Sequence, residues 1–583
     1  MEMTTSGAGG VTKLDDDDYP SAAPADRCPP GTEKKMCRRV LLVGSLVTLP
    51  LLAFFVFSRE NASVAWLQVA IAQLTATNDD DGAAGTRVYG GRRSSWPRAH
   101  DEFLGGLLAP GMDRRSCRSR YQSSRYYKHF PFAPSPHLLQ KLRGYEARHR
   151  RCAPGTPLYA KAVEQLRSGH SAEGGTECSY VVWLPFDGLG NRMLSMVALG
   201  PYSPLVSGFL YALLTGRVLL AALPPDSSDL FCEPFPGATW RLPAEDFPVA
   251  NLFGVGQDME RSYTKLVDGM VAANATAGVA PSYVYLSLGW LLRDGLFFCG
   301  EHQLALRRVD WLLLYSDLYF APSLYAVAEF QDELRRLFPE KESVHHLLSR
   351  YLLHPANPVW SMVTRYYRAY LAPAARRIGV QIRMFDHASI PADDMYGQIL
   401  NCSRQEHVLP ETDDVGEAAP SPTASSGGRN DPTTAIFVAS LYADYYRRLT
   451  SRYSTAKGGG ATRRVGVFQR THEERQATES LAHNQRALAE IYLLSFCEEL
   501  VTSGLSTFGY VSSGLAGIRP AILLTAFDHV VPETPCRRAA SIEPCNLTPP
   551  RGVECLSRPA DKDDLARHVR VCEDFKDGVK FFD

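Results

Sequence analysis

The sequence has almost no net charge, because 62 Lys and Arg residues stand against 63 Asp and Glu residues and leave a formal charge of -1. A chain without a basic excess lacks the electrostatic footprint of nucleic-acid binding, so nucleic acid is not an expected partner. Cysteine pairs at CxxC spacing are also missing, which argues against a zinc centre. The 583 residues have an ordinary globular composition, 45% hydrophobic and 21% charged, and suffice for two or more domains.

An uncharged apolar run from Val40 to Phe57 is long enough to span a hydrocarbon core of roughly 30 Å. Basic residues come directly before this run and the charges after it cancel, so the positive-inside rule places the N-terminus in the cytosol. A cleaved signal peptide is the alternative, but the run begins late and no clean cleavage site follows it. The sequence therefore predicts a cytosolic tail (1–39), a transmembrane signal anchor (40–58) and a lumenal stem (59–115).

Beyond the stem, the apolar pattern indicates an α/β fold of two lobes, 116–360 and 361–583, with a nucleotide-sized cleft between them. In the first lobe it predicts a βαβ unit, with a strand at 180–186, a helix at 192–214 and a strand at 217–222. In the second lobe it predicts strands at 378–384, 464–469, 500–502 and 520–525 and helices at 435–450 and 485–497. A stretch rich in Pro, Ser and Gly at 409–433 is expected to be a disordered surface insertion.

Most of the 13 cysteines lie beyond the apolar run, and four of them crowd near the C-terminus at Cys536, Cys545, Cys555 and Cys572. In a lumenal compartment such cysteines are expected to form disulfides, and zinc is a weaker alternative because no histidine stands at a ligand spacing. The number of cysteines beyond the run is odd, so one thiol is left over. Cys497, inside an apolar helical stretch, is the expected free one.

Two glycines and two polar side chains stand between the first predicted strand and helix, in the stretch FDGLGNRMLS. Glycines after a strand let the backbone turn tightly and let a ligand approach the amides of a helix N-terminus, where the helix dipole favours anions. Gly190, Asn191 and Arg192 are therefore candidate contacts of an anionic ligand. Taken alone, a βα turn with two glycines is more often only a turn.

Further stretches extend this pattern over residues 116–583. They are GFLYALLTGRVLL, DGLFFC, IGVQIRMFD, VGVFQRTHEE, AEIYLLS, LVTSGLSTFGYVSSGLAGIRP, SIEPC and HVRVCED. Together with DGLGNRMLS, and in this order, they resemble the plant cell-wall fucosyltransferases of glycosyltransferase family 37. The resemblance implies a type II Golgi membrane protein with two Rossmann-like lobes in the GT-B arrangement, which transfers fucose from GDP-fucose with inversion.

The resemblance includes the residues expected to bind the diphosphate. Arg383 follows a predicted buried strand, and its planar guanidinium suits two charge-assisted hydrogen bonds to a diphosphate, which would also stabilise the charge of departing GDP. A structural ion pair is the alternative. Ser506, Thr507 and the amides of Phe508 and Gly509 are expected to donate to phosphate oxygens at a helix start, where a plain N-cap is the alternative.

Two further residues are assigned by their position in the family pattern. His472 is an expected contact of the guanosine, with a surface histidine as the alternative. Asp294, in LLRDGLFFCGEH of the acceptor-binding lobe, is the candidate general base for the acceptor hydroxyl. The family pattern has His and Lys on either side of this Asp, where this chain has Arg293 and Gly295, and Asp294 also suits a turn.

The acidic clusters lie mostly in the tail, the stem and the insertion. Inside the fold, Asp393 and Asp394 follow Pro391, which is the arrangement expected for the first turn of a helix. We therefore expect no metal site and no cofactor, and activity without a divalent cation.

The resemblance therefore implies a Golgi fucosyltransferase that moves L-fucose in α-1,2 linkage to galactose of xyloglucan or arabinose of arabinogalactan, in plant cell-wall biogenesis. One alternative is a catalytically inactive GDP-binding subunit of a Golgi wall-synthesis complex, and another is an extracellular carbohydrate-binding protein. The expected partners are GDP-fucose, a polysaccharide or proteoglycan acceptor and the membrane. A homodimer is compatible with the sequence.

Overall fold

The structure, a computed structural model, describes residues 101–583 apart from 173, 186–201, 226, 250–251, 253–260, 273–278, 289–291, 317, 386–387, 412–432, 456–464, 475–476, 478–479, 551–554 and 556–564. The expected tail, the apolar run and most of the stem therefore lie outside the described residues, as does most of the expected insertion. None of the helices in the described part of the chain is both long enough and apolar enough to cross a membrane.

The first sheet has four parallel strands in the order β2-β1-β4-β3. They are β1 (Tyr180–Leu184), β2 (Val218–Ala221), β3 (Tyr283–Leu288) and β4 (Trp311–Ser316). Successive side chains of β1 face two different apolar clusters, Val181 in one and Val182 in the other, as expected for a strand buried on both faces. The two strands expected in this lobe are present, and β3 and β4 are additional.

The second sheet has six strands in the order β10-β9-β8-β5-β6-β7, all parallel except for β10, which pairs antiparallel with β9. They are β5 (Arg376–Ile382), β6 (Thr434–Ser440), β7 (Val465–Gln469), β8 (Glu499–Ser503), β9 (Ala521–Leu523) and β10 (Cys536–Arg538). A separate hairpin near the C-terminus joins β11 (Val569–Val571) to β12 (Val579–Phe581). The α/β class with parallel sheets is thus confirmed.

The helix expected at 435–450 is wrong in its first half, because that half is β6, the strand next to the edge strand β7. Buried apolar runs this short fit a strand and a helix equally well by their pattern. The chain turns after β6, where the Ser440 hydroxyl accepts a hydrogen bond from the Tyr442 amide at 3.1 Å. Only then does α12 (Ala443–Thr455) begin.

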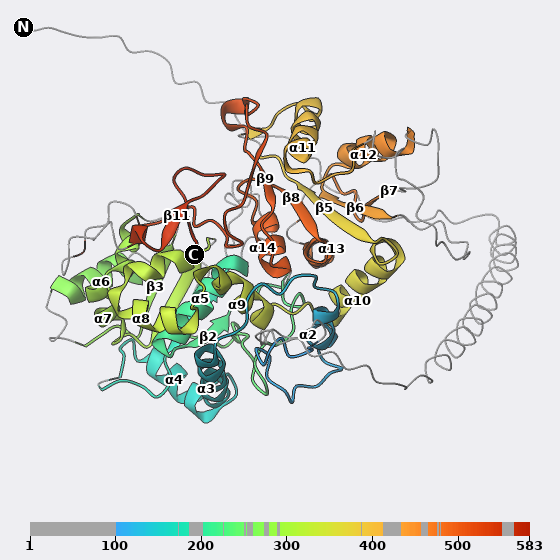
Figure 1. Cartoon of the computed structure of the whole chain (residues 1–583). Helices are drawn as coiled ribbons and strands as arrows, with labels where there is room; N and C mark the ends of the chain where they lie inside the picture. Colours follow the sequence, from blue (N-terminus) through green and yellow to red (C-terminus); the bar gives the residue numbers. More distant parts are fainter. Residues whose placement is uncertain are drawn as a thin grey trace, which may run out of the picture. The chain divides into compact units, whose positions relative to one another are not determined.

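Helices cover both sheets (Figure 1). The earlier ones in the chain are α2 (Arg118–Gln122), α3 (Pro136–Cys152), α4 (Pro157–Arg167), α5 (Tyr202–Thr215), α6 (Tyr263–Ala272), α7 (Gly300–Leu306), α8 (Ala328–Leu337) and α9 (Val344–Leu352). The later ones are α10 (Asn357–Tyr366), α11 (Ala392–Glu406), α12, α13 (Leu481–Ser495) and α14 (Thr507–Ala516). The lobe boundary expected at 360–361 falls inside α10.

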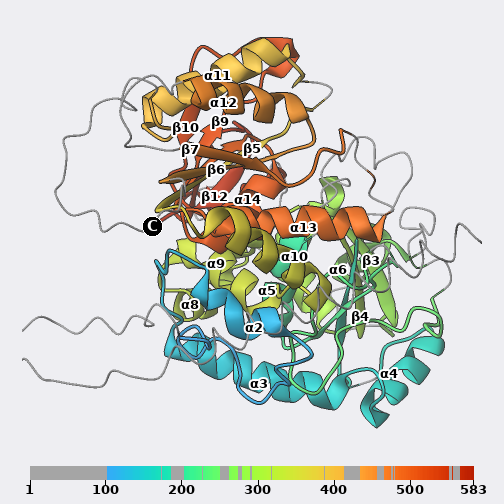
Figure 2. The ribbon, with the colours of Figure 1, turned by 90° about the vertical axis from the view of Figure 1, so that its right-hand side faces the viewer.

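Two layers of helices cover the second sheet. Figure 2 shows α11 and α12 on one face and α13 on the other, and the side chains of β6 alternate between the corresponding apolar clusters. α11 begins after Pro391 with Asp393 and Asp394 in its first turn, which confirms the helix start expected there. Asp393 also pairs with Arg448 of α12.

Five disulfides pair every described cysteine except Cys497, which is a buried free thiol as expected. The pairs are Cys117–Cys232, Cys152–Cys178, Cys299–Cys555, Cys402–Cys536 and Cys545–Cys572. Two clusters of described residues have metal-binding side chains, Cys299, Glu301 and Cys555, and Cys545, Cys572 and Asp574. In both clusters the two sulfurs are joined to each other, so neither offers a thiolate.

Candidate active site

The carboxyl ends of β5 and β8 lie side by side and are joined by side-chain hydrogen bonds. The Arg383 amide donates to Ser503 Oγ at 2.8 Å, and the Ser503 amide donates to Gln381 Oε1 at 3.1 Å. Gln381 is buried, so its amide side chain is fixed between the two strands. The backbone at Arg383 is therefore held in register with the start of the loop that follows β8.

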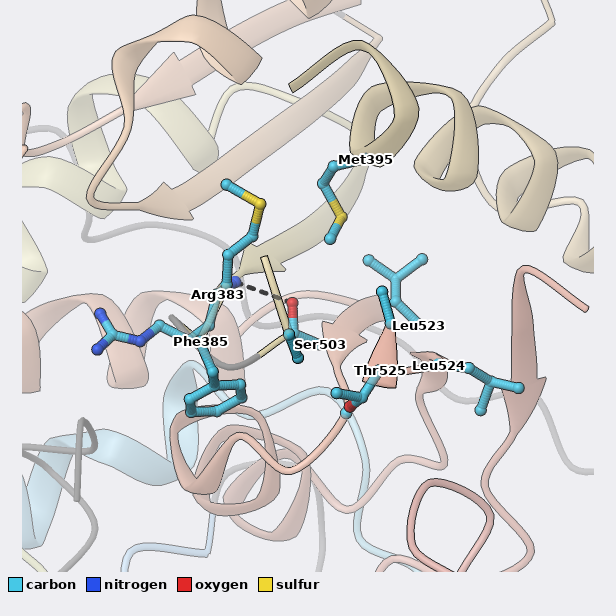
Figure 3. Close-up of a pocket in the computed structure, with 11 residues that line it drawn as sticks. Arg383, Phe385, Met395, Ser503, Leu523, Leu524 and Thr525 are labelled. Carbon is cyan, nitrogen blue, oxygen red and sulfur yellow. Dashed lines mark hydrogen bonds between the residues drawn. The ribbon is translucent and has the colours of Figure 1, made fainter. Parts of the chain in front are cut away.

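A small hollow opens at these strand ends, lined also by Met395 of α11 and by residues 523–526 at and after the end of β9. Figure 3 shows the Arg383 guanidinium on the opposite side of Ser503 from Leu523. Its central carbon lies 5.9 Å from the ring centroid of Phe385. The cation thus lies to one side of the hollow, whose walls are mainly apolar side chains and backbone.

The N-terminus of α14 follows directly after β8. Ser506 is its N-cap residue but makes no side-chain cap hydrogen bond, and Thr507 Oγ1 is buried with no hydrogen-bond partner among the described residues. A Cβ on Gly509 would lie 2.8 Å from Thr502 Cβ, so only glycine lets the helix start approach β8 this closely. That the first-turn amides of this helix donate to a phosphate stays a prediction.

A carboxylate from the C-terminal segment shapes the turn before α14. Leu505 has a φ of 58°, a strained value for a residue with a branched side chain. Its amide donates to Asp574 Oδ2 at 2.9 Å, and the Tyr510 hydroxyl donates to the same oxygen at 2.5 Å. Because the Cys545–Cys572 disulfide ties down this segment, Asp574 is a fixed acceptor that supports the turn.

The C-terminus of α14 is held by α9, which belongs to the first lobe. The buried Arg350 guanidinium donates to the Leu515 carbonyl at 2.8 and 3.0 Å and to His129 O at 3.0 Å. His346 Nδ1 donates to Gly514 O at 2.6 Å, so the proton is on Nδ1. Burial lowers the pKa of Arg350 to about 10, and the residue therefore stays cationic near neutral pH, where it complements the negative end of the helix dipole.

His472 follows β7 and is exposed, with its ring centroid 5.6 Å from that of Tyr446. Its neighbour Thr471 donates to Glu490 Oε1 of α13 at 2.5 Å. Burial raises the pKa of Glu490 to about 7. Since β6 separates β7 from β5, His472 and Arg383 follow strands of the same sheet that are two positions apart.

Asp294 lies in the short helix η3 (Leu292–Phe298), after β3 of the first sheet, and is only 1% exposed. Thr264 Oγ1 donates to its Oδ1 at 2.8 Å, and the Ser287 amide donates to its Oδ2 at 2.6 Å. In this arrangement the carboxylate supports the end of β3. A role as general base stays a prediction, because a base must come within hydrogen-bond reach of the acceptor hydroxyl.

The structure thus brings Arg383 and the Ser506–Gly509 stretch to adjoining strand ends, and places Asp294 on the other sheet. Gly190, Asn191 and Arg192 lie outside the described residues. Sequence reasoning assigned no role to Asp574 or to Arg350, although both belong to the hydrogen bonds that fix α14. The motif HVRVCED contains Asp574, but only the folded chain shows what this residue contacts.

Comparisons with known proteins agree on one family. The model of the family described as xyloglucan fucosyltransferase matches residues 70–555. The chain is 45% identical over 486 residues to a galactoside 2-alpha-L-fucosyltransferase of Arabidopsis thaliana, covering 82% of this chain and 83% of the relative. It is 44% identical over 490 residues to a galactoside 2-alpha-L-fucosyltransferase of Pisum sativum, covering 83% and 82%.

A solved structure supports the same assignment. A mutant of the Arabidopsis thaliana protein FUT1, in complex with GDP, aligns with a TM-score of 0.70 at 42% sequence identity. The alignment covers 82% of this chain and 100% of that chain. Since the family model and these relatives each match most of the sequence, the chain belongs to the xyloglucan fucosyltransferase family and is a glycosyltransferase.

Proposed function

We propose that this protein is an inverting fucosyltransferase that moves L-fucose from GDP-fucose, in α-1,2 linkage, to galactose of xyloglucan or arabinose of arabinogalactan. The observation that carries the proposal is the N-terminus of α14, which no side chain among the described residues caps, beside the strand end that bears Arg383. Amides and a guanidinium in this arrangement suit a diphosphate. The related FUT1 structure has GDP bound, which supports a guanosine diphosphate donor.

In the proposed reaction, the acceptor hydroxyl oxygen attacks the anomeric carbon of fucose while the bond from that carbon to the β-phosphate oxygen breaks. GDP leaves with the electron pair, and its charge develops where Arg383 and the amides of α14 are expected to donate. The hydroxyl proton passes to a base, for which Asp294 is the candidate. His472 and the undescribed Gly190, Asn191 and Arg192 complete the proposed donor contacts.

We also propose that the reaction needs no divalent cation. A guanidinium and the positive end of a helix dipole supply the charge that a metal ion would otherwise bring to the diphosphate. Full loss of transfer in EDTA, with recovery only on addition of Mn²⁺, would contradict this part of the proposal.

We propose a Golgi location, with the catalytic part in the lumen behind the signal anchor from Val40 to Phe57. The five disulfides support an oxidising compartment. Protease protection of the tagged C-terminus in sealed Golgi vesicles is the expected result. Digestion of that tag without detergent would place the chain on the other side of the membrane.

The direct test offers GDP-fucose and EDTA to the purified full-length chain, with defucosylated xyloglucan and arabinogalactan in parallel. We expect transfer to one of them, and a loss of at least about 100-fold in Arg383→Ala, the size of effect seen when a donor to a developing oxyanion is removed. Arg404→Ala, on the exposed side of α11, is the matched control. GDP binding without transfer would instead favour an inactive subunit, which the names of the relatives do not support.

A further inference from the structure

Two stretches of the form Asn-x-Ser/Thr, the acceptor motif of N-linked glycosylation, lie in the described part of the chain, at Asn401 and at Asn546. We infer that the folded protein carries an N-linked glycan on Asn401, on the exposed side of α11, and none on Asn546, whose side chain instead joins the C-terminal hairpin to the first lobe. This inference rests on the proposed lumenal location, because glycans of this class are attached in the lumen.

Asn401 lies in α11 and is exposed. Its Oδ1 accepts a hydrogen bond from Arg404 Nη2 at 2.8 Å, while Nδ2, the atom that would bear the glycan, has no partner among the described residues. One helical turn earlier on the same face, a Cβ on Gly397 would meet no atom within 4 Å. Because α11 covers the outside of the second sheet (Figure 2), a glycan here would extend into solvent and displace no side chain.

The disulfide beside Asn401 can form only late in synthesis. Cys402, the middle residue of the motif, pairs with Cys536 across 134 residues of sequence. At a synthesis rate of about 5–20 residues per second, this partner follows on the order of 10 s later. The stretch around Asn401 therefore enters the lumen well before its disulfide can hold it.

The transfer itself needs an oligosaccharide on a lipid diphosphate and a lumenal oligosaccharyltransferase. Nδ2 of Asn401 attacks the anomeric carbon of the oligosaccharide while the bond from that carbon to the diphosphate oxygen breaks. The lipid diphosphate leaves with the electron pair, and a base of the transferase takes the amide proton. The product is an uncharged amide that carries a sugar, which the exposed side of α11 accommodates.

Asn546 is in the opposite situation, because it is only 1% exposed. Its Nδ2 donates to Ser323 Oγ at 2.7 Å, and its Oδ1 accepts from the Thr548 amide at 3.2 Å. Its backbone pairs with Val579 of β12 through hydrogen bonds of 2.8 and 3.0 Å. Ser323 lies in the short helix η4 (Ala321–Ala326) of the first lobe, so the Asn546 side chain fastens the hairpin of β11 and β12 to that lobe. A glycan on Nδ2 would have to displace Ser323, which the native fold excludes.

The disulfide next to Asn546 can close early. Cys545 pairs with Cys572 across only 27 residues, and closing so short a loop costs less entropy than closing one of 134 residues. The partner cysteine follows within about 1–5 s at the same rate of synthesis. The two motifs therefore differ both in their burial and in the time for which they stay open to the transferase.

Two pairs of substitutions in the full-length chain test the inference. Asn401→Gln removes the first motif, and Arg404→Ala, which keeps it, is the matched control. Thr548→Ala removes the second motif but keeps the hydrogen bonds of Asn546, because Thr548 is exposed and contributes only its amide. Asn546→Ala removes the motif and the bond to Ser323 together. The readouts are the glycosylated sites by peptide mass spectrometry, the electrophoretic mobility and the urea midpoint.

We expect a glycan on Asn401 in the chain purified from plant Golgi membranes, and a shift in mobility by one glycan in Asn401→Gln but not in Arg404→Ala. Thr548→Ala should match the parent chain in mobility and in urea midpoint. Asn546→Ala should unfold at a lower urea concentration, because Ser323 Oγ loses its buried donor. Equal midpoints for these two variants would contradict the role given to the Asn546 side chain.

An unmodified Asn401 in a chain whose C-terminal tag is protected from protease would overturn the inference while leaving the proposed function intact. A glycan on Asn546 in the folded chain would overturn it as well. Digestion of the tag without detergent would refute the proposed lumenal location and this inference with it. No transfer of fucose by a chain that carries the expected glycan is the distinct outcome that refutes the proposed reaction alone.

Discussion

The buried cation at the C-terminus of α14 gives the sharpest stability prediction. Arg350 is 3% exposed, and the hydrogen bonds described above join it to carbonyl oxygens rather than to a carboxylate. Its guanidinium carbon also lies 3.9 Å from the ring centroid of Tyr127 and 5.0 Å from that of Phe130. Arg350→Met keeps a side chain of similar length but removes the charge and every one of these donors.

Two opposing effects set the size of the change. Each buried carbonyl left without a donor costs about 1–3 kcal/mol, and the lost cation–π contacts cost about 1–2 kcal/mol. Against this, a methionine needs no desolvation, which returns several kcal/mol. The carbonyls belong to the last turn of α14 and to His129, where water has little access. We therefore expect the cost of the lost hydrogen bonds and cation–π contacts to exceed the gain in desolvation. The free energy of unfolding should fall by about 1–3 kcal/mol.

Urea unfolding of the full chain measures this difference from the midpoint and the slope. Arg350→Lys keeps the charge but loses the fork that donates to Leu515 and the flat face toward Tyr127, so we expect an intermediate loss. Arg404→Met, which changes an exposed arginine that bonds Asn401, is the control. If Arg350→Met unfolds at the same urea concentration as this control, the buried cation contributes nothing and the reasoning is refuted.

Three further predictions concern the donor site and its surroundings. Gly509→Ala should weaken GDP binding about tenfold or more in calorimetry, because the added Cβ would lie 2.8 Å from Thr502 Cβ and push α14 off β8. The control Gly397→Ala on α11 meets open space and should keep the affinity for GDP. Asp574→Ala should also raise the Kd for GDP, because the Leu505 amide loses its acceptor, and an unchanged Kd would show that the turn holds its shape alone. Burial raises the pKa of Glu490 to about 7, so the folded chain binds this proton more tightly than the unfolded chain does. The resulting stability is full below about pH 4.5 and is lost by about pH 7, a fall of roughly 3 kcal/mol that Glu490→Gln should abolish in urea titrations across this range.

The strands and helices that the sequence predicts correctly are those whose boundaries are indicated by their own residues. Strands β5, β7 and β8 are apolar runs with clear boundaries, and the helix start at Asp393 carries its own signal in Pro391. The run that became β6 lacked such a boundary, because Ser440 ends the strand through a local hydrogen bond that a periodicity count does not register.

The residues of the candidate site also differ in whether local sequence features predict their positions. The positions of Arg383 after a strand and of Ser506 at a helix start could be predicted because a strand end and a helix start are local features, whereas their roles in donor binding stay a prediction. Asp574 and Arg350 could not be predicted, because each acts on α14 from a distant part of the sequence, and no spacing indicates such a contact.

The supports of α14 have a mechanical consequence. At its C-terminus, a Cβ on Gly514 would lie 2.2 Å from His345 Nδ1, and one on Gly517 would lie 2.8 Å from His346 Cε1, so α14 and α9 are in direct contact. At its N-terminus, α14 packs closely against β8 of the second sheet through Gly509. α14 is therefore a rigid connection between the two lobes, with the diphosphate expected at one end of it. A motion that separates α9 from β8 would therefore break the Arg350 hydrogen bonds or shift the N-terminus of α14 from β8.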